Sequence, residues 1–334
     1  MSSPLSARGA DPGVLRSKRQ AGVPEIAGLL VLALILMLSG CARFASSPLP
    51  QSPGTPARAA VSGVPFYPQD EFQCGPAALA MALGWSGMAL TPGDLSAEVY
   101  TPGRKGSLQS ALITAARRHD RVAYPIRGSA ALLTEVAAGH PVIVLVNLGL
   151  SWYPKWHYAV VIGYDQQQRE IILHSGRIAD ERLANRVFKN IWRRSDYWGL
   201  LVLPPEQLPA SAEELPWLEA VAGLEQAERW PAAATGYNVA LKRWPQSFVA
   251  WMGLGNSRYR LQDLAGAAEA FSMAAKLQPK SGFAFNNLAH VLLRLGQRQE
   301  AIKAARRAVS LGGSAIDSFR QTLREVEAGA SAGE

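Results

Sequence analysis

The pattern of apolar and polar positions changes three times along this chain. An unbroken apolar run occupies residues 26–38, and a stretch rich in Pro, Ser and Ala follows it. From residue 61 onward, short helical and strand-like periods alternate, and beyond residue 205 the pattern is helical throughout. These changes predict a signal peptide at 1–40, a flexible linker at 41–60, a folded domain at 61–205 and helical repeats at 206–330.

Within the folded domain, helical periods precede strand-like ones. The strands at 157–164 and 170–176 flank a polar turn and predict a hairpin. Helices followed by an antiparallel sheet are typical of an α+β fold. The predicted helices are 74–85, 106–120 and 129–139, and the predicted strands are 141–150, 157–164, 170–176 and 197–204.

The helical part repeats itself every 34 residues. Pro245 and Pro279 share this step, as do Trp217, Trp251 and Phe285. "WMGLG" at 251–255 resembles the start of the tetratricopeptide pattern, and three such repeats followed by a capping helix at 314–330 are expected. The resemblance implies an all-α solenoid whose concave surface binds a protein partner.

Charge and composition exclude several classes of function. The net charge is +8, but Lys and Arg are spread along the chain with no run of five, so no nucleic-acid partner is predicted. No Cys/His spacing indicates a metal site, and no Gly-x-x-x-x-Gly-Lys run indicates a nucleotide site. We therefore expect no metal and no cofactor.

One of the two cysteines belongs to a processing signal. The apolar run is short for a membrane span and ends in Leu38-Ser39-Gly40-Cys41, which resembles the lipobox of bacterial lipoproteins. The resemblance implies a lipid on Cys41 that holds the protein to a membrane. Because Ala42 and not Asp follows the cysteine, the resemblance to such lipoproteins also implies sorting to the outer membrane, facing the periplasm. The alternative is an uncleaved signal anchor.

The other cysteine, Cys74, stands where a reactive thiol would. It begins a predicted helix, and Pro76 suits the first turn of that helix. A helix N-terminus and a nearby imidazolium both lower a thiol pKa, so an activated thiolate is expected. His157, at the start of a strand, is the candidate base, whereas His119, His140 and His290 are interpreted as surface residues.

Two stretches together resemble a known family. "PQDEFQCGPAALAMAL" and "WHYAVVIGYD" are similar to the bacteriocin-processing, double-glycine cysteine peptidases of the papain-like superfamily. The resemblance implies a papain-like cysteine peptidase domain with Cys74 as nucleophile and His157 as general base. It also implies that Gln69 completes the oxyanion hole, with Gln73 as a weaker rival.

The sequence departs from this family at the third member of the triad. The family orients its histidine with an acid near the end of the next strand, but Ser175 stands there, beside His174. Asp180 or Asp196 are alternative partners. The leading hypothesis is a peptidase that cleaves peptide or protein substrates. The alternatives are an inactive peptidase-fold scaffold acting through its repeats, amide exchange or deamidation, and a merely structural Cys74.

Overall fold

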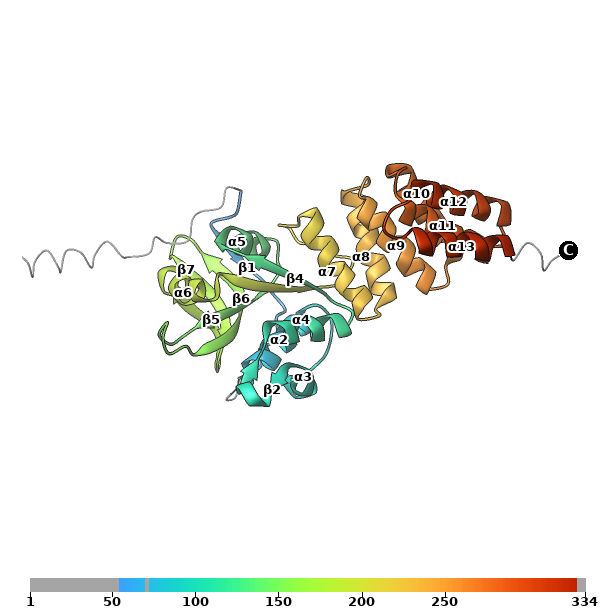
Figure 1. The fold of residues 1–334 in the computed structure, drawn as a ribbon. Helices are drawn as coiled ribbons and strands as arrows, with labels where there is room; N and C mark the ends of the chain where they lie inside the picture. Colours follow the sequence, from blue (N-terminus) through green and yellow to red (C-terminus); the bar gives the residue numbers. More distant parts are fainter. Residues whose placement is uncertain (1–53, 70–71, 329–334) are drawn as a thin grey trace, which may run out of the picture. The chain divides into compact units, whose positions relative to one another are not determined.

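The computed structural model describes residues 54–69 and 72–328, whose order along the chain can be followed in Figure 1. The predicted signal peptide, Cys41 and most of the predicted linker lie outside these residues. Within the described part of the chain, no helix combines the length and apolar character needed to cross a membrane.

A seven-stranded antiparallel sheet forms the centre of the first domain. Its main order is β4-β9-β5-β6-β7-β8, and β1 pairs with the end of β6. β6 is the longest strand and pairs with three others, so it is the axis of the domain. The strands are β1 (Arg58–Ala60), β4 (Val122–Arg127), β5 (Val142–Asn147), β6 (Trp156–Asp165), β7 (Glu170–Ser175), β8 (Ile178–Ala184) and β9 (Trp198–Leu203).

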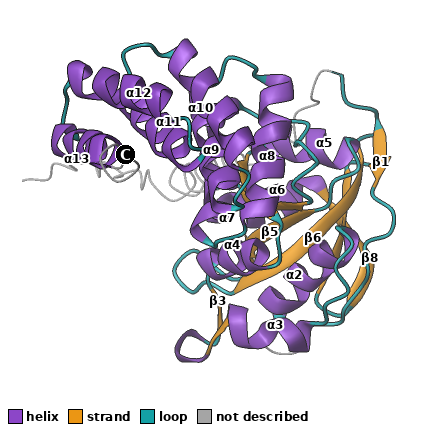
Figure 2. Cartoon of the chain, turned by 90° about the vertical axis from the view of Figure 1, so that its right-hand side faces the viewer, coloured by secondary structure: helices purple, strands orange, loops and turns teal. Residues whose placement is uncertain are grey.

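In the described residues five α-helices belong to the sheet domain, and α2 is buried in the hydrophobic core of that domain. α2 buries nine of its twelve residues, because it is apolar on all sides, and it contacts β6, along which it lies in Figure 2. A short hairpin, β2 (Tyr100–Thr101) and β3 (Gly106–Ser107), extends toward the first turn of α2. The helices are α2 (Cys74–Trp85), α3 (Pro92–Val99), α4 (Gln109–Arg118), α5 (Ser129–Ala137) and α6 (Asn185–Trp192).

The α+β prediction is confirmed, but some assignments differ from the structure. Residues 58–60, assigned to the flexible linker, form β1, because their backbone completes the hydrogen bonding of β6. The strands β4 and β8 and the helices α3 and α6 were not predicted. β4 contains Pro125, and β8 is polar and exposed, so neither stretch has a clear strand pattern.

The interpretation of His140 as a surface residue is wrong. His140 is buried, and its Nδ1 lies 2.6 Å from the Glu135 carboxylate. Ser211 donates two further hydrogen bonds to that carboxylate, from its backbone N–H and its hydroxyl. Gln207 reaches the other ring nitrogen of His140 at 2.8 Å. A buried carboxylate is stable only with such partners, so this cluster fixes the segment that leaves the sheet.

The remaining helices repeat with the predicted period. The first helices of the pairs begin at Glu214, Phe248 and Gly282, and the second helices begin at Trp230, Leu264 and Arg298. Each step is 34 residues, which confirms the tetratricopeptide arrangement. The helices are α7 (Glu214–Gln226), α8 (Trp230–Arg243), α9 (Phe248–Arg260), α10 (Leu264–Leu277), α11 (Gly282–Arg294), α12 (Arg298–Leu311) and the capping α13 (Ile316–Ala328).

Small residues allow the repeat helices to pack closely. Ala233, Ala267 and Ala301 recur at the 34-residue step and are fully buried. At Gly253 an added Cβ would lie 2.2 Å from the ring of Tyr237, so this aromatic side chain fills the space that the glycine leaves. Small and large residues therefore alternate across the helix contacts, as the repeat pattern requires.

Candidate active site

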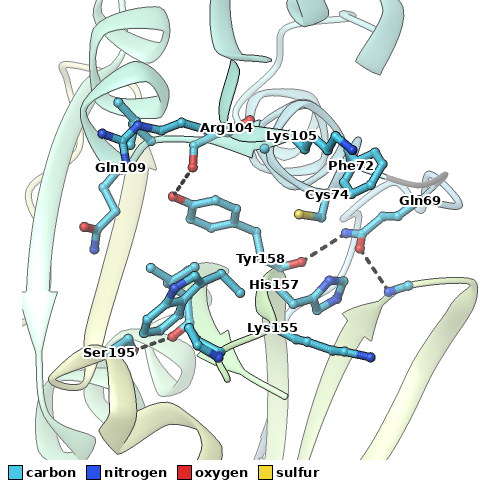
Figure 3. Close-up of a pocket in the computed structure, with 17 residues that line it drawn as sticks. Gln69, Phe72, Cys74, Arg104, Lys105, Gln109, Lys155, His157, Tyr158 and Ser195 are labelled. Atoms are coloured by element: carbon cyan, nitrogen blue, oxygen red, sulfur yellow. Dashed lines mark hydrogen bonds between the residues drawn. The ribbon is translucent and has the colours of Figure 1, made fainter. Parts of the chain in front are cut away.

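Cys74 is the first residue of α2 and a free thiol. Its backbone N–H belongs to the first turn of the helix, whose N–H groups have no acceptor within the helix. The side chain is half-buried and lines a cavity of about 920 Å³ (Figure 3). A nucleophile at a helix N-terminus, open to a cavity, can be reached by a substrate carbonyl.

Gly75 permits the β2–β3 hairpin to close one side of this cavity. An added Cβ at Gly75 would lie 2.2 Å from the hydroxyl oxygen of Ser107, so a larger residue would displace the hairpin. The Ser107 carbonyl in turn accepts a hydrogen bond from the Tyr158 hydroxyl on β6. The glycine after the cysteine is therefore explained by packing between α2 and β3.

His157 lies in the same cavity as Cys74, near the start of β6. Its Nε2 is 3.2 Å from the Ser175 hydroxyl, at the end of β7. When Nε2–H donates to this hydroxyl, Nδ1 carries the lone pair that can accept a proton. Ser175 can orient the ring in this way, but it brings no charge that would stabilise an imidazolium.

Gln69 is held beside the cysteine by three hydrogen bonds. Its Nε2 donates to the Tyr158 carbonyl at 3.2 Å, and its Oε1 accepts from the Gly176 N–H at 3.1 Å (Figure 3). Its backbone N–H donates to the Gly176 carbonyl. The side-chain amide is thus fixed in the wall of the cavity, with a second hydrogen on Nε2. Gln73, the weaker rival, lies outside the cavity lining and accepts a hydrogen bond from Ser96.

The other candidate partners of His157 lie elsewhere. His174 is buried, accepts a hydrogen bond from the Asp180 N–H and donates to the Val64 carbonyl, so both of its ring nitrogens are used. The Asp196 carboxylate pairs with Arg127. Among the described residues, only Ser175 has a side chain hydrogen-bonded to the His157 ring. The structure brings together Cys74, His157, Gln69 and Ser175, and it leaves out His174.

The charge state of the pair differs from the expectation. Burial raises the pKa of the Cys74 thiol, although backbone N–H groups of Tyr158, Gly75 and Cys74 itself oppose this effect. Burial also lowers the pKa of the His157 imidazole. The expected activated thiolate is therefore not the resting state, because desolvation favours the neutral form of each group. At neutral pH the site holds a thiol beside a neutral imidazole.

The cavity has basic and aromatic walls that the sequence analysis did not assign to a site. Arg104 and Lys105, on the turn between β2 and β3, lie on one side, and Lys155 lies on the other (Figure 3). Trp156 also lines it and is half exposed. Pro102-Gly103 is a turn signal in the sequence, but nothing local links this turn to Cys74, because only the fold brings the two together. In the parts of the chain that the structure describes, no cluster of three or more His, Cys, Asp or Glu side chains could hold a metal ion.

The first domain matches a known family. Residues 61–197 match the model of the Peptidase_C39 like family. No curated protein matches the chain. Because this match agrees with the α+β fold and the cysteine–histidine cavity, the chain contains a Peptidase_C39-like domain followed by tetratricopeptide repeats.

Solved structures resemble parts of the chain. A Bacillus anthracis protein described as C39-like is 19% identical with a TM-score of 0.37, over 44% of this chain and 97% of that one. The first tetratricopeptide domain of Spaghetti (RPAP3), bound to an HSP90 peptide, is 18% identical with a TM-score of 0.34, over 35% and 93%. The Sgt2 tetratricopeptide domain from Aspergillus fumigatus is 17% identical with a TM-score of 0.34, over 36% and 81%.

Proposed function

We propose that this protein is a cysteine peptidase that cleaves peptide bonds through an acyl-enzyme. The observation that carries the proposal is one cavity in which Cys74 begins a buried helix, His157 faces Ser175, and the Gln69 amide is fixed beside them. A thiol, an oriented base and fixed amide donors are the parts that acyl transfer needs.

The first step forms the bond between sulfur and the substrate carbonyl carbon. Because both groups are neutral at rest, the thiol proton passes to His157 Nδ1 as the sulfur attacks. Nε2–H remains bonded to Ser175, which keeps the ring in place. The negative charge moves to the carbonyl oxygen, where the Cys74 N–H and the second hydrogen of Gln69 Nε2 stabilise it.

The second step breaks the carbon–nitrogen bond. The His157 imidazolium gives its proton to the leaving amine, and the acyl group stays on the sulfur. Water then attacks this thioester while His157 takes a proton from it. As the carbon–sulfur bond breaks, His157 gives that proton to the sulfur, which releases a carboxylic acid and restores the thiol. The proposed reaction uses Cys74, His157, Ser175, Gln69 and water, and none of its steps calls for a metal or cofactor.

The test is cleavage of a defined peptide mixture. The purified full chain is incubated with peptides from a digested bacterial proteome, and new termini are identified by mass spectrometry. We expect cleavage that is lost in Cys74→Ala and in His157→Ala. His119→Ala is the matched control, because His119 pairs with Glu98 at a partly buried position outside the cavity lining. New termini that persist in Cys74→Ala would contradict the proposal.

A scaffold function is the second candidate. It is favoured by one observation: within the described residues, the His157 ring has a hydroxyl partner and no carboxylate partner. Under this function the repeats would bind a protein while Cys74 stays unreactive. A chain that cleaves no peptide but still captures a defined partner through its repeats would support it.

The repeats supply a surface for a protein partner in either case. A cavity of about 270 Å³ lies between α9 and α11 and is lined by Asn256, Tyr259, Asn287 and His290, among others. Asn side chains there can bond to the backbone of an extended peptide, which fits recruitment of a substrate protein to the first domain.

Anchoring at the bacterial outer membrane, facing the periplasm, completes the proposal. Its support is the sequence Leu38-Ser39-Gly40-Cys41 after an apolar run, with Ala42 following. Cells grown with a labelled fatty acid should incorporate label into the wild-type chain, and Cys41→Ser should remove it. Label that remains on Cys41→Ser would contradict lipidation at this residue.

A further inference from the structure

The described residues that line the cavity of Cys74 carry charge of one sign. Among the residues that the structure describes, its lining contains the cations Arg104, Lys105 and Lys155 and no Asp or Glu. Arg104 and Lys105 come from the turn between β2 and β3, and Lys155 comes from the segment before β6. Figure 3 places the first two on the side opposite Lys155, with Cys74 between them. A substrate that reaches the sulfur therefore passes between cations on both sides.

These cations have no ionic partner within the described part of the chain. Other arginines of the domain do: Arg58 pairs with Asp165, and Arg182 pairs with Glu170. The ammonium of Lys105 lies 6.0 Å from the centre of the Phe72 ring, a cation–π contact that does not neutralise its charge. Positive charges around a concave surface add to one another's electric field, and together they attract a negatively charged ligand.

Exposed apolar side chains line the same cavity as the cations. Trp156 and Leu108 line the cavity and are about half exposed, at 51% and 43%. Such surface is covered when an extended peptide packs along it. The walls thus combine apolar contact for a peptide chain with positive charge for its side chains.

We infer that the cavity selects extended peptide segments that carry Asp or Glu side chains close to the scissile bond. The inference rests on the proposed function, because it takes the occupant to be the peptide that Cys74 attacks. Carboxylates on either side of that bond reach Arg104 and Lys105 on one wall and Lys155 on the other. Arg104, Lys105 and Lys155 are then residues that determine specificity and take no part in the chemistry.

The test measures binding separately from turnover. The full chain carrying Cys74→Ala is titrated with three pools of dye-labelled ten-residue peptides, which differ only in having Glu, Gln or Lys at four fixed positions. Fluorescence anisotropy should show that the Glu pool binds about tenfold more tightly than the Gln pool, with the Lys pool weakest. The preference should shrink as salt is raised, because these charges are solvent-accessible.

Substitution of Arg104, Lys105 and Lys155, which we call the rim, tests whether these residues cause the preference. Adding Arg104→Gln, Lys105→Gln and Lys155→Gln should reduce the ratio of Glu to Gln affinity to about one. Binding of the Gln pool should stay unchanged, which shows that the variant is folded.

The matched control removes three charges elsewhere, as Arg186→Gln, Lys242→Gln and Lys276→Gln. These residues are exposed and lie outside the cavity, so the Glu preference should persist. Equal binding of the Glu and Gln pools by the intact rim would overturn the inference, as would a Glu preference that survives in the rim variant.

Cleavage by the wild-type chain separates this inference from the proposed function. Cleavage with no enrichment of Asp or Glu near the cut would remove the inference and leave the peptidase standing. Tight Glu-specific binding with no cleavage would remove the peptidase and leave an acidic-peptide site. Cleavage enriched in acidic residues supports both.

Discussion

The repeats and the sheet domain bury their apolar surface in different ways. In the repeats, each helix packs on the next one along the chain: Gly253 lies against Tyr237, and Gly255 lies against Phe271. In the sheet domain, β9 pairs with β4 and β5, and β1 pairs with β6, across long stretches of sequence. The repeats are therefore stabilised by contacts between successive helices. The sheet domain, in contrast, must pair strands that are distant in the sequence before the residues of its candidate site come together.

The candidate active site depends on contacts between segments that are far apart in the sequence. Gln69, Cys74, His157 and Ser175 come from a loop, a helix and two strands, and β6 connects them. The repeat surface needs only two adjacent helix pairs to be formed. Chemistry in one region and binding in the other should therefore respond differently to substitution.

The largest expected effect is loss of turnover at the site alone. Cys74→Ala should reduce peptide cleavage by about 10³-fold or more, because no other group can form the acyl bond. The melting temperature and binding at the repeats should not change. Cleavage rates and thermal melts of the two chains check this, and a loss of cleavage that follows a loss of folding would not count as support.

Truncation of a core residue should affect the two regions unequally. Leu79 in α2 is fully buried, so Leu79→Ala should cost about 2–5 kcal/mol of unfolding free energy and abolish cleavage by disturbing Cys74. Phe271→Ala in α10 should cost about 3–5 kcal/mol locally while cleavage of short peptides continues. Hydrogen exchange would locate each loss, and a Phe271→Ala chain unable to cleave short peptides would contradict the comparison.

A smaller effect is expected where Ser175 replaces the acid of the family. Ser175→Ala should reduce cleavage about tenfold, because the His157 ring loses its orienting hydroxyl. Ser175→Asp should raise the pKa of His157 by about one to three pH units and stabilise a thiolate–imidazolium pair. The rate of Cys74 alkylation at pH 6 should then increase. An unchanged rate in Ser175→Asp would show that this side chain does not act on the imidazole.

The smallest effect is expected at Glu135, which binds Ser211 in the segment between the sheet domain and the repeats. Burial raises the pKa of Glu135, but hydrogen bonds from His140 and Ser211 outweigh it, and the pKa lies below the ordinary 4.5. A lowered carboxyl pKa contributes stability above pH 4.5 that is lost as pH falls through the folded-state value. Glu135→Gln should cost about 1–3 kcal/mol at neutral pH and flatten this acid dependence. Denaturant melts from pH 3 to 7 measure both, and parallel curves would contradict the assignment.

Sequence predicted the repeats better than the sheet domain, for a physical reason. An aromatic residue recurs at a fixed step, at Trp217, Trp251 and Phe285, because the helices of each repeat pack against one another in the same way. The position of Cys74 on a helix was also readable, because apolar residues and a glycine–proline pair follow it. Pairings such as β1 with β6 leave little local pattern, and residues 58–60 were therefore assigned to the linker.

The site shows the same division. Cys74 and His157 were predicted from their places at a helix start and a strand start, and Gln69 from the resemblance of two stretches to a family; the structure places all three in one cavity. The neutral state of the pair was not predicted, because it follows from burial that only the folded chain creates. The place of the cations at 104 and 105 was not predicted for the same reason: only the fold carries their hairpin to the sulfur.

The most direct test of the cysteine–histidine pair is the pH dependence of Cys74 alkylation by iodoacetamide, with and without His157. The His157 pKa is lowered from 6.5, so a neutral base is available at pH 6.5 and above, whereas the thiol pKa is raised above 9.0. The wild-type chain should therefore react measurably from about pH 6.5 upward. His157→Ala should react only as pH approaches and passes 9. Identical pH profiles for the two chains would mean that the imidazole does not serve the sulfur, and the peptidase mechanism would fail.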